Sequence, residues 1–382
     1  MNFDQVVNRR HTNSIKWDRY GDALPLWVAD MDFSAPEPVL EALRQRVEHG
    51  VFGYTLPPAE LYRVVQVWLK ERYNWKVERR AIRFLPGVMR GVNMLARAVG
   101  QPGDGILVQP PVYYPFFDVP KNSGRVLQQA QVPQVNGHYQ IDFPALEATI
   151  TQRTRLFLLC NPHNPIGRVY TRPELAQLAE ICLRHNLIIC SDEIHSDLIF
   201  SGHQHIPIAT LSPEVTQRTV TVFAPSKTFN LPGLACSVMI IQNPTLRKEV
   251  LAAGAGLVHG SNIMGYTAAL AAYRHGAEWL AQLLRYLQAN RDYLSNFVQT
   301  RLPGLRMVKP EGTYLAWLNC RAADLPNNPH QFFLDQAQVA LNNGARFGPG
   351  GKGFVRLNFG CPRATLAEAL ERMENALVKR NS

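Results

Sequence analysis

A lysine that could form a covalent bond to a ligand lies directly after an apolar segment. Lys227 follows the run TVTVFA and precedes a turn that contains proline and glycine, in APSKTFNLPGL. A lysine that is partly removed from water has a lowered pKa, which favours Schiff-base formation with a carbonyl compound. An ordinary exposed loop lysine would fit the same residues, so both interpretations stay open for this position alone.

A carboxylate stands at the end of a second apolar segment. Asp192 closes the run LIICSD, and a carboxylate at the end of a buried strand is unfavourable unless it is paired or solvated. Asp192 could keep a proton on the nitrogen of a bound heterocycle, or it could cap the strand or form a structural ion pair. His195, three residues later, could be catalytic or structural.

Three further segments carry groups that suit a ligand. PGVMRG (86–91) places a glycine before a helix start, where backbone amides can bind phosphate, although such turns are common. Asn164, in CNPHNPIG, offers both a donor and an acceptor between prolines, and a polar turn is the alternative. Arg356, in the apolar run FVRLNF, needs an anionic partner, which is either a substrate carboxylate or a structural acid.

The elements that must position these residues alternate between strand and helix. Short apolar runs separated by amphipathic helices predict an α/β fold with a mostly parallel central sheet and helices on both faces. Ligands bind beyond the carboxyl ends of such strands, where Asp192 and Lys227 lie. Thr171 and Glu174 form a capping box at the start of one helix. The predicted strands are IRFL, GILVQ, RLFLLC, LIICSD, TVTVFA and ACSVMII.

The two ends of the chain have a different pattern. Before the sheet, helices are predicted at 37–49 and 58–73, and after about residue 275 a long helix is followed by strands, a helix and a final helix. We therefore expect a large α/β domain at 46–275 and a smaller α+β domain from 1–45 and 276–382. The later elements are a helix at 277–300, the strands TYLAWLN and FVRLNFG, the helix HQFFLDQAQVALNNG between them, and a helix at 364–378.

Composition excludes several classes of protein. The chain has 382 residues, 46% of them hydrophobic, and a net charge of +10. Its basic residues are scattered, without the 5–8-residue basic run of a nucleic-acid patch, and no stretch of 18 apolar residues predicts a membrane span. The six cysteines form no CxxC pair, and no signal-like segment opens the chain. We expect a cytoplasmic protein with reduced thiols and no metal site.

Together the motifs resemble one enzyme family. PGVMRG, PPVYYPF, NPHNPIG, SDEIH, SKTFNLPG and FVRLNFG occur in the order found in fold-type I enzymes that use pyridoxal phosphate (PLP), the aminotransferase class I/II superfamily. The resemblance spans about residues 27–363. It is closer still to the cystathionine β-lyase or C–S lyase subgroup (MalY/PatB type), through WVADMDF, FGYT, SDEIHSDLIF, SKTFNLPGL and FGPGGKGFVRLNFGCPR.

This resemblance implies roles for the residues around the cofactor ring. Lys227 would bind PLP covalently and later act as the base at the substrate Cα. Asp192 would pair with the pyridine nitrogen, Asn164 would hydrogen-bond the ring hydroxyl oxygen, and Tyr113 would stack on the ring and take part in catalysis. His195, which also belongs to the expected cofactor site, stands where aminotransferases usually have a tyrosine.

The resemblance also implies how the phosphate and the substrate are held. Arg356 would bind the substrate α-carboxylate, with Asn164 and the backbone of Ala29 beside it. Tyr54 would reach the phosphate of a neighbouring subunit, which implies a homodimer with shared active sites. Ala235 replaces the phosphate-binding arginine of aminotransferases, so the other contacts would have to supply more of the binding. Those contacts are Ser226, the helix start at Val88 and Met89, and Tyr54; Gly87 would also contact the phosphate.

The implied reaction is an α,β-elimination. The substrate would be an amino acid, L-cystathionine or a related S-substituted L-cysteine, which yields a thiol (homocysteine), pyruvate and ammonia. One alternative is a class I/II aminotransferase, because it shares the roles of Lys227 and Asp192. Another is a lyase with a second, regulatory binding role. Pyruvate formed without an added keto acid would distinguish the lyase from the aminotransferase.

Overall fold

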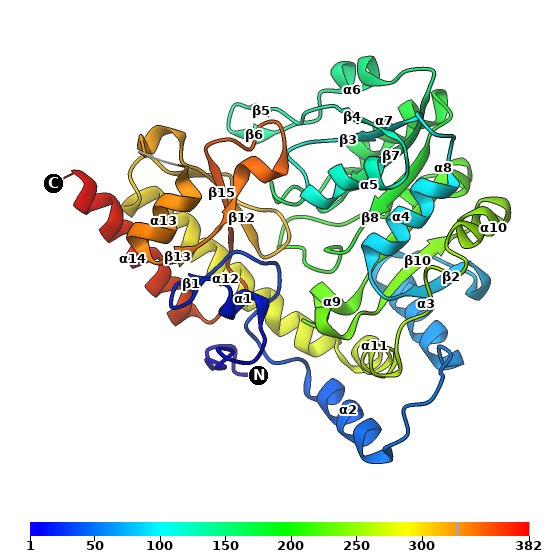
Figure 1. Ribbon diagram of the computed structural model, residues 1–382, viewed down its shortest axis with the longest axis horizontal. Helices are drawn as coiled ribbons and strands as arrows, with labels where there is room; N and C mark the ends of the chain where they lie inside the picture. The colour runs from blue at the N-terminus through cyan, green and yellow to red at the C-terminus, as the bar shows by residue number, and fades with distance from the viewer. Residues whose placement is uncertain (326–327, 382) are drawn as a thin grey trace.

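A seven-stranded sheet forms the centre of the computed structural model, which describes residues 1–325 and 328–381 (Figure 1). Its strand order is β2-β10-β9-β8-β7-β3-β4. β10 is antiparallel to both neighbours, and the other pairs are parallel, which confirms the predicted mostly parallel sheet. The strands are β2 (Ile82–Leu85), β3 (Gly105–Val108), β4 (Val126–Gln129), β7 (Thr154–Cys160), β8 (Ile188–Asp192), β9 (Thr219–Phe223) and β10 (Ser237–Ile241).

Both faces of this sheet are covered, which explains its continuous apolar strands. Along β7, Leu156 and Leu158 face a cluster built with α4 (Val88–Ala98) and α10 (Pro244–Ala253). Phe157 and Leu159 face the opposite cluster, built with α6 (Phe143–Thr149), α7 (Arg172–Arg184) and α8 (Pro213–Arg218). Successive strand residues point to opposite faces, so one apolar run fills two cores. The capping box at Thr171 and Glu174 is confirmed at the start of α7.

A smaller antiparallel sheet lies beside the large one, with strand order β11-β12-β15-β14 (Figure 1). The long helix α12 (Ala277–Arg301) leads into it from α11 (Ile263–His275), which packs against α2 (Glu37–His49) and α3 (Ala59–Tyr73). In the part of the chain that is described, no helix combines the length and apolar character needed to cross a bilayer. The remaining elements are β11 (Arg306–Met307), β12 (Leu315–Asn319), α13 (Pro329–Ala337), β14 (Asn342–Asn343), β15 (Phe354–Asn358) and α14 (Arg363–Asn381).

The N-terminal segment joins this smaller sheet region. β1 (Leu24–Pro25) pairs in parallel with β13 (Val339–Ala340), and the Asn358 N–H donates to the Leu26 carbonyl at 2.8 Å. Figure 1 accordingly shows the blue start of the chain beside its orange and red end. The domain division at 46–275 stays a prediction.

One predicted helix is wrong in its second half. HQFFLDQAQVALNNG was expected to be a single helix, but α13 ends at Ala337 and Gln338 takes a left-handed conformation with φ of 52°. The next residues form β13, which pairs with β1, and Asn342 donates its amide to the Trp27 carbonyl at 3.0 Å. Pairing with the N-terminal segment therefore outweighs the local helical pattern, which spacing alone cannot reveal.

Candidate active site

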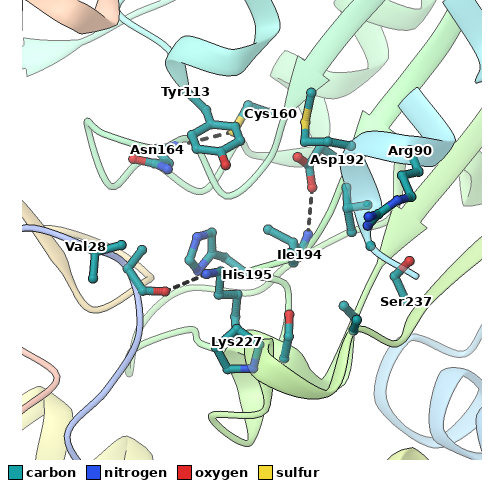
Figure 2. A pocket seen from close by; sticks show the side chains of 18 of the residues that line it. Val28, Arg90, Tyr113, Cys160, Asn164, Asp192, Ile194, His195, Lys227 and Ser237 are labelled. Atoms are coloured by element: carbon teal, nitrogen blue, oxygen red, sulfur yellow. Dashed lines mark hydrogen bonds between the residues drawn. The ribbon is translucent and has the colours of Figure 1, made fainter. Parts of the chain in front are cut away.

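A cavity of about 370 Å³ opens at the carboxyl ends of β7, β8 and β9, beside the start of α4 (Figure 2). It brings together the residues predicted for the site, with one exception. Tyr54 lies outside it with a fully exposed side chain, so a role for Tyr54 would require a second subunit. The predicted residues that line the cavity are Ala29, Gly87, Val88, Met89, Tyr113, Asn164, Asp192, His195, Ser226, Lys227 and Arg356.

Lys227 sits in the short helix α9 (Pro225–Thr228) that follows β9. Its Nζ donates a hydrogen bond to the Ala29 carbonyl. Burial lowers the pKa of Lys227 to about 8; nearby Asp30 and Asp192 oppose that shift, and Arg356 adds to it. Near neutral pH a useful fraction of this amine is therefore uncharged, as attack on an aldehyde requires.

Asp192 ends β8 inside the cavity and is 4% exposed. Its Oδ1 accepts a hydrogen bond from the Ile194 N–H at 3.1 Å. Burial raises the pKa of Asp192 to about 7, and the negative charge of Glu193 adds to the shift, whereas the Ile194 hydrogen bond and Lys227 oppose it. Within residues 1–325 and 328–381 no cation forms an ion pair with Asp192, so its carboxylate is suited to a protonated ring nitrogen.

Arg356, on β15, is buried at 2% exposure. It donates to Asn164 Oδ1 and to the Trp27 carbonyl, both at 2.9 Å, while its Nε has no hydrogen-bond partner among the described residues. Burial lowers the pKa of Arg356 to about 10. No described acid forms an ion pair with this guanidinium, so a structural acid does not explain its burial, and the group is available to an anionic ligand.

Asn164 and Tyr113 lie on the same side of the pocket in Figure 2. Because Asn164 Oδ1 accepts from Arg356, its amide nitrogen is the group left to donate to a ligand oxygen. Burial raises the pKa of Tyr113 to about 12, so its hydroxyl stays protonated at neutral pH. Its ring also contacts Tyr114 at 5.5 Å between centroids, and it forms a flat wall against which a planar cofactor could stack.

His195 is buried beside the lysine, and Figure 2 shows its ring next to the Lys227 amine. It meets the Tyr314 ring edge-on with centroids 5.8 Å apart, and in the described part of the chain its Nδ1 has no hydrogen-bond partner. Burial drives the pKa of His195 well below its ordinary value, and the positive charges of Lys227 and Arg356 add to that effect. The imidazole is therefore neutral at physiological pH.

The start of α4 forms the end of the cavity suited to phosphate. Gly87 precedes the helix with φ of 134°, a conformation that favours glycine. The first N–H groups of a helix have no partner within it, and they carry partial positive charge. Ser226 and Ala235 also line this cavity, and the Ala235 side chain brings no charge. The helix N–H groups and the Ser226 hydroxyl therefore suit a phosphate.

The wall that carries Ala29 is held by a buried ionic cluster. Asp32, 3% exposed, accepts from Lys16 Nζ and Arg9 Nη1 at 2.7 Å and from Trp17 Nε1 at 2.8 Å. Lys16 is fully buried. Breaking a buried pair of this kind leaves an uncompensated charge, so the cluster fixes the segment that faces Lys227. Sequence patterns did not indicate it.

Sequence reasoning also missed residues that line the cavity. Arg90 could have been noticed, because a cation in the first turn of a helix opposes the helix dipole. Tyr114 adjoins the predicted Tyr113, but nothing in the sequence shows that both face the cavity. The missed lining residues include Val28, Arg90, Tyr114, Cys160, Ile194, Cys236 and Ser237.

The residues fit PLP. An amine with a lowered pKa, a buried carboxylate that no described cation pairs with, and a helix start lie around one cavity, and they match the aldehyde, the ring nitrogen and the phosphate of that cofactor. The buried guanidinium of Arg356 remains available for a second, anionic molecule. An enzyme that acts on amino acids needs such separate groups for the cofactor and for the substrate carboxylate.

Comparisons with known proteins agree with this geometry. The model of the family "Aminotransferase class I and II" matches residues 22–373. Cystathionine beta-lyase PatB from Bacillus subtilis is 43% identical over an alignment of 389 positions, gaps included. The alignment covers 99% of this chain and 100% of the relative. Cystalysin from Treponema denticola, solved with PLP, is 33% identical with a TM-score of 0.96 over 99% of both chains.

A further solved structure, the PLP-bound C–S lyase from Staphylococcus hominis, is 32% identical with a TM-score of 0.95 over 100% of both chains. Family model, curated relative and solved structures all extend over nearly the whole chain, including the cavity. The protein therefore belongs to the aminotransferase class I and II family and uses pyridoxal phosphate as its cofactor.

Proposed function

We propose that this protein is a carbon–sulfur β-lyase that converts L-cystathionine or a related S-substituted L-cysteine into a thiol (homocysteine), pyruvate and ammonia. One structural observation supports an α-amino acid as the substrate: the Lys227 amine and the buried Arg356 guanidinium face one cavity, and neither forms an ion pair with a described acid. An α-amino acid bound there would have its carboxylate at Arg356 and its Cα towards Lys227. The names of PatB and of the Staphylococcus hominis C–S lyase support this reaction.

The proposed mechanism begins with orientation of the substrate. Arg356 binds the α-carboxylate, and its own position is fixed by Asn164 and the Trp27 carbonyl. When bound, PLP supplies an electron sink for the pair left at Cα. Asp192 keeps a proton on the ring nitrogen, and that proton makes the sink effective.

Lys227 then moves the proton. Its neutral Nζ takes the proton from Cα, a step worth roughly 10²–10⁴-fold in rate when the base is well placed. The Cβ–S bond breaks with its electron pair going to sulfur, and the sulfur takes up a proton to leave as a thiol. Addition of water to the remaining three-carbon fragment releases pyruvate and ammonia.

The test is a product assay without an amino-group acceptor. Purified holoenzyme is incubated with L-cystathionine and no added keto acid, and pyruvate and free thiol are measured. Equal amounts of both support the β-lyase. Turnover that requires a keto acid would instead identify an aminotransferase and reject the proposal.

We also propose a homodimer with shared active sites. The connection between α2 and α3 extends away from the rest of the subunit (Figure 1), and its apolar side chains are exposed: Phe52 by 57%, Tyr54 fully and Leu56 by 84%. A second copy would cover them and bring Tyr54 to the partner's phosphate site. Sedimentation of the wild-type protein and of Tyr54→Ala, together with the PLP affinity of each, tests the assembly and the shared contact separately.

A cytoplasmic location is part of the proposal. All six cysteines are buried free thiols, as in proteins that fold without disulfides. Fractionation of cells that produce the untagged protein tests it.

A further inference from the structure

The phosphate end of the cavity carries a cation in an unusual position. Arg90 is the third residue of α4, and its side chain folds back to the helix start, where Nη1 donates to the Pro86 carbonyl. A Cβ atom placed on Gly87 would lie 3.3 Å from that same Nη1. The guanidinium therefore sits over the amino end of α4, beside the helix N–H groups that face the cavity.

This position is electrostatically unfavourable for a cation in the protein alone. The amino end of a helix carries partial positive charge, so a cation there is opposed rather than stabilised. The first turn of α4 contains no acidic residue, and none of the described Asp or Glu side chains forms an ion pair with Arg90. An anion from outside the chain would turn this unfavourable arrangement into a favourable one.

The other cations of the cavity are directed elsewhere. Lys227 points to the Ala29 carbonyl, and Arg356 is bound to Asn164. Figure 2 shows Arg90 on the Ser237 side of the pocket, away from Asn164 and Val28. Of the lining residues described, only Arg90 brings a full positive charge to the end where α4 begins.

Because Ala235 is uncharged, the phosphate end of the cavity needs a positive charge from another residue. Ala235 lines the same cavity, and its methyl group offers a phosphate dianion neither a hydrogen bond nor a charge. The helix start and Ser226 supply only dipoles and a neutral hydroxyl. A basic side chain close to the helix start would supply the positive charge that these groups lack.

We propose that Arg90 binds the phosphate of PLP and provides the positive charge that Ala235 does not. The proposal rests on the cofactor assignment and not on the lyase reaction. A guanidinium can donate two parallel hydrogen bonds to phosphate oxygens. Because Arg90 is exposed, it can make these bonds without rearrangement of the core. Arg90 thus favours the phosphorylated cofactor over pyridoxal, which lacks the phosphate.

The test compares cofactor binding by three full-length proteins. Wild type, Arg90→Gln and Arg97→Gln are purified as holoenzymes, stripped of cofactor, and titrated with PLP and with pyridoxal while visible absorbance is recorded. Arg97 is the matched control because it is exposed on the same helix, about two turns further on. Within the described residues, it donates only to the Asn122 carbonyl, at 3.4 Å. Both substitutions remove one positive charge.

We expect Arg90→Gln to weaken PLP binding by about tenfold to a hundredfold, the value of one or two charge-assisted hydrogen bonds. Its affinity for pyridoxal should equal that of wild type, and Arg97→Gln should change neither affinity. Inorganic phosphate should compete with PLP for wild type more strongly than for Arg90→Gln.

The proposal would be overturned by an unchanged ratio of PLP affinity to pyridoxal affinity in Arg90→Gln, whether both affinities stay the same or both fall equally. Arg90→Met serves as a second uncharged variant if glutamine disturbs the helix start, and thermal melting of each stripped protein checks folding. Wild type that acquires no visible absorbance with PLP would instead contradict the cofactor assignment, so the two failures are distinguishable.

Discussion

Thr228 donates its hydroxyl proton to Oδ2 of Asp197 at 2.9 Å, one residue after Lys227. Oδ1 of Asp197 accepts from the Tyr73 hydroxyl at 2.7 Å and pairs with Arg72 Nε at 2.8 Å. Both of those partners belong to α3. A single buried carboxylate therefore fastens the turn that carries the lysine to a helix far away in the sequence.

We expect Asp197→Asn to lower kcat more than it raises KM. The substitution keeps the shape but removes the charge that Arg72 needs, so Thr228 and the lysine turn lose a rigid support. Because Arg72 is partly exposed, the free energy of unfolding should fall by about 1–3 kcal/mol, measured in urea. Thr228→Val, which removes one hydrogen bond only, should also lower kcat, but by a smaller factor. Wild-type kcat in Asp197→Asn would contradict this role.

Replacement of Lys227 by alanine tests the proposed base directly. We expect Lys227→Ala to lose pyruvate formation and the visible absorbance of the covalently bound cofactor, because no other described amine lines the cavity. Thermal melting should show a folded protein. Turnover by Lys227→Ala at the wild-type rate would exclude the assignment.

The carboxylate of Asp192 makes the stability of the cofactor-free protein depend on pH. Its pKa is raised to about 7, so between about pH 4 and pH 7 the folded state binds more protons than the unfolded state. The free energy of unfolding should therefore fall as pH rises through this window, by up to about 4 kcal/mol for a raised pKa of this size.

Asp192→Asn should remove this dependence. The stripped variant should be more stable than stripped wild type at pH 8, with little difference near pH 4.5, although it should bind PLP more weakly. Urea unfolding at the two values of pH measures the change. Parallel pH profiles for the two stripped proteins would show that Asp192 does not titrate in this window.

Arg356→Lys should separate substrate binding from cofactor binding. Lysine cannot reproduce the paired hydrogen bonds of a guanidinium, so kcat/KM for L-cystathionine should fall by about a hundredfold. PLP absorbance should be retained. Arg306→Lys, an exposed change in the same small sheet, is the control and should be neutral. Undiminished kcat/KM in Arg356→Lys would place the substrate carboxylate elsewhere.

The sequence predicted the centre of the site because parallel strands end at a common edge. Asp192 closes one apolar run and Lys227 follows another, and neighbouring strands β8 and β9 bring those ends together. The strand pattern therefore carried spatial information. The order of the motifs along the chain then indicated the family, and the resemblance implied a role for each residue.

Features that depend on side-chain direction or on distant contacts were not predictable. Nothing in PGVMRG shows that Arg90 folds back over the helix start. Asp197 receives a hydrogen bond from Trp68, 129 positions away. The end of α13 depends on pairing with residues near the start of the chain. Hydropathy predicts that a charged lysine is exposed, so it argues against burial of Lys16. The structure shows that Lys16 is buried as the ion-pair partner of Asp32.

The wall opposite Lys227 is translated first, but one of its supports is translated near the end of the chain. Asn358 donates its amide to the carbonyls of Val28 and Asp30, both at 2.7 Å, and Arg356 donates to Trp27. A nascent chain on the ribosome has made this wall and its ionic cluster but lacks the contacts from β15. We expect cofactor capture to follow the emergence of β15, because Arg356 and Asn358 complete the support of the wall. Truncations before that strand would yield a polypeptide that retains Lys227 but has no enclosed site for the cofactor.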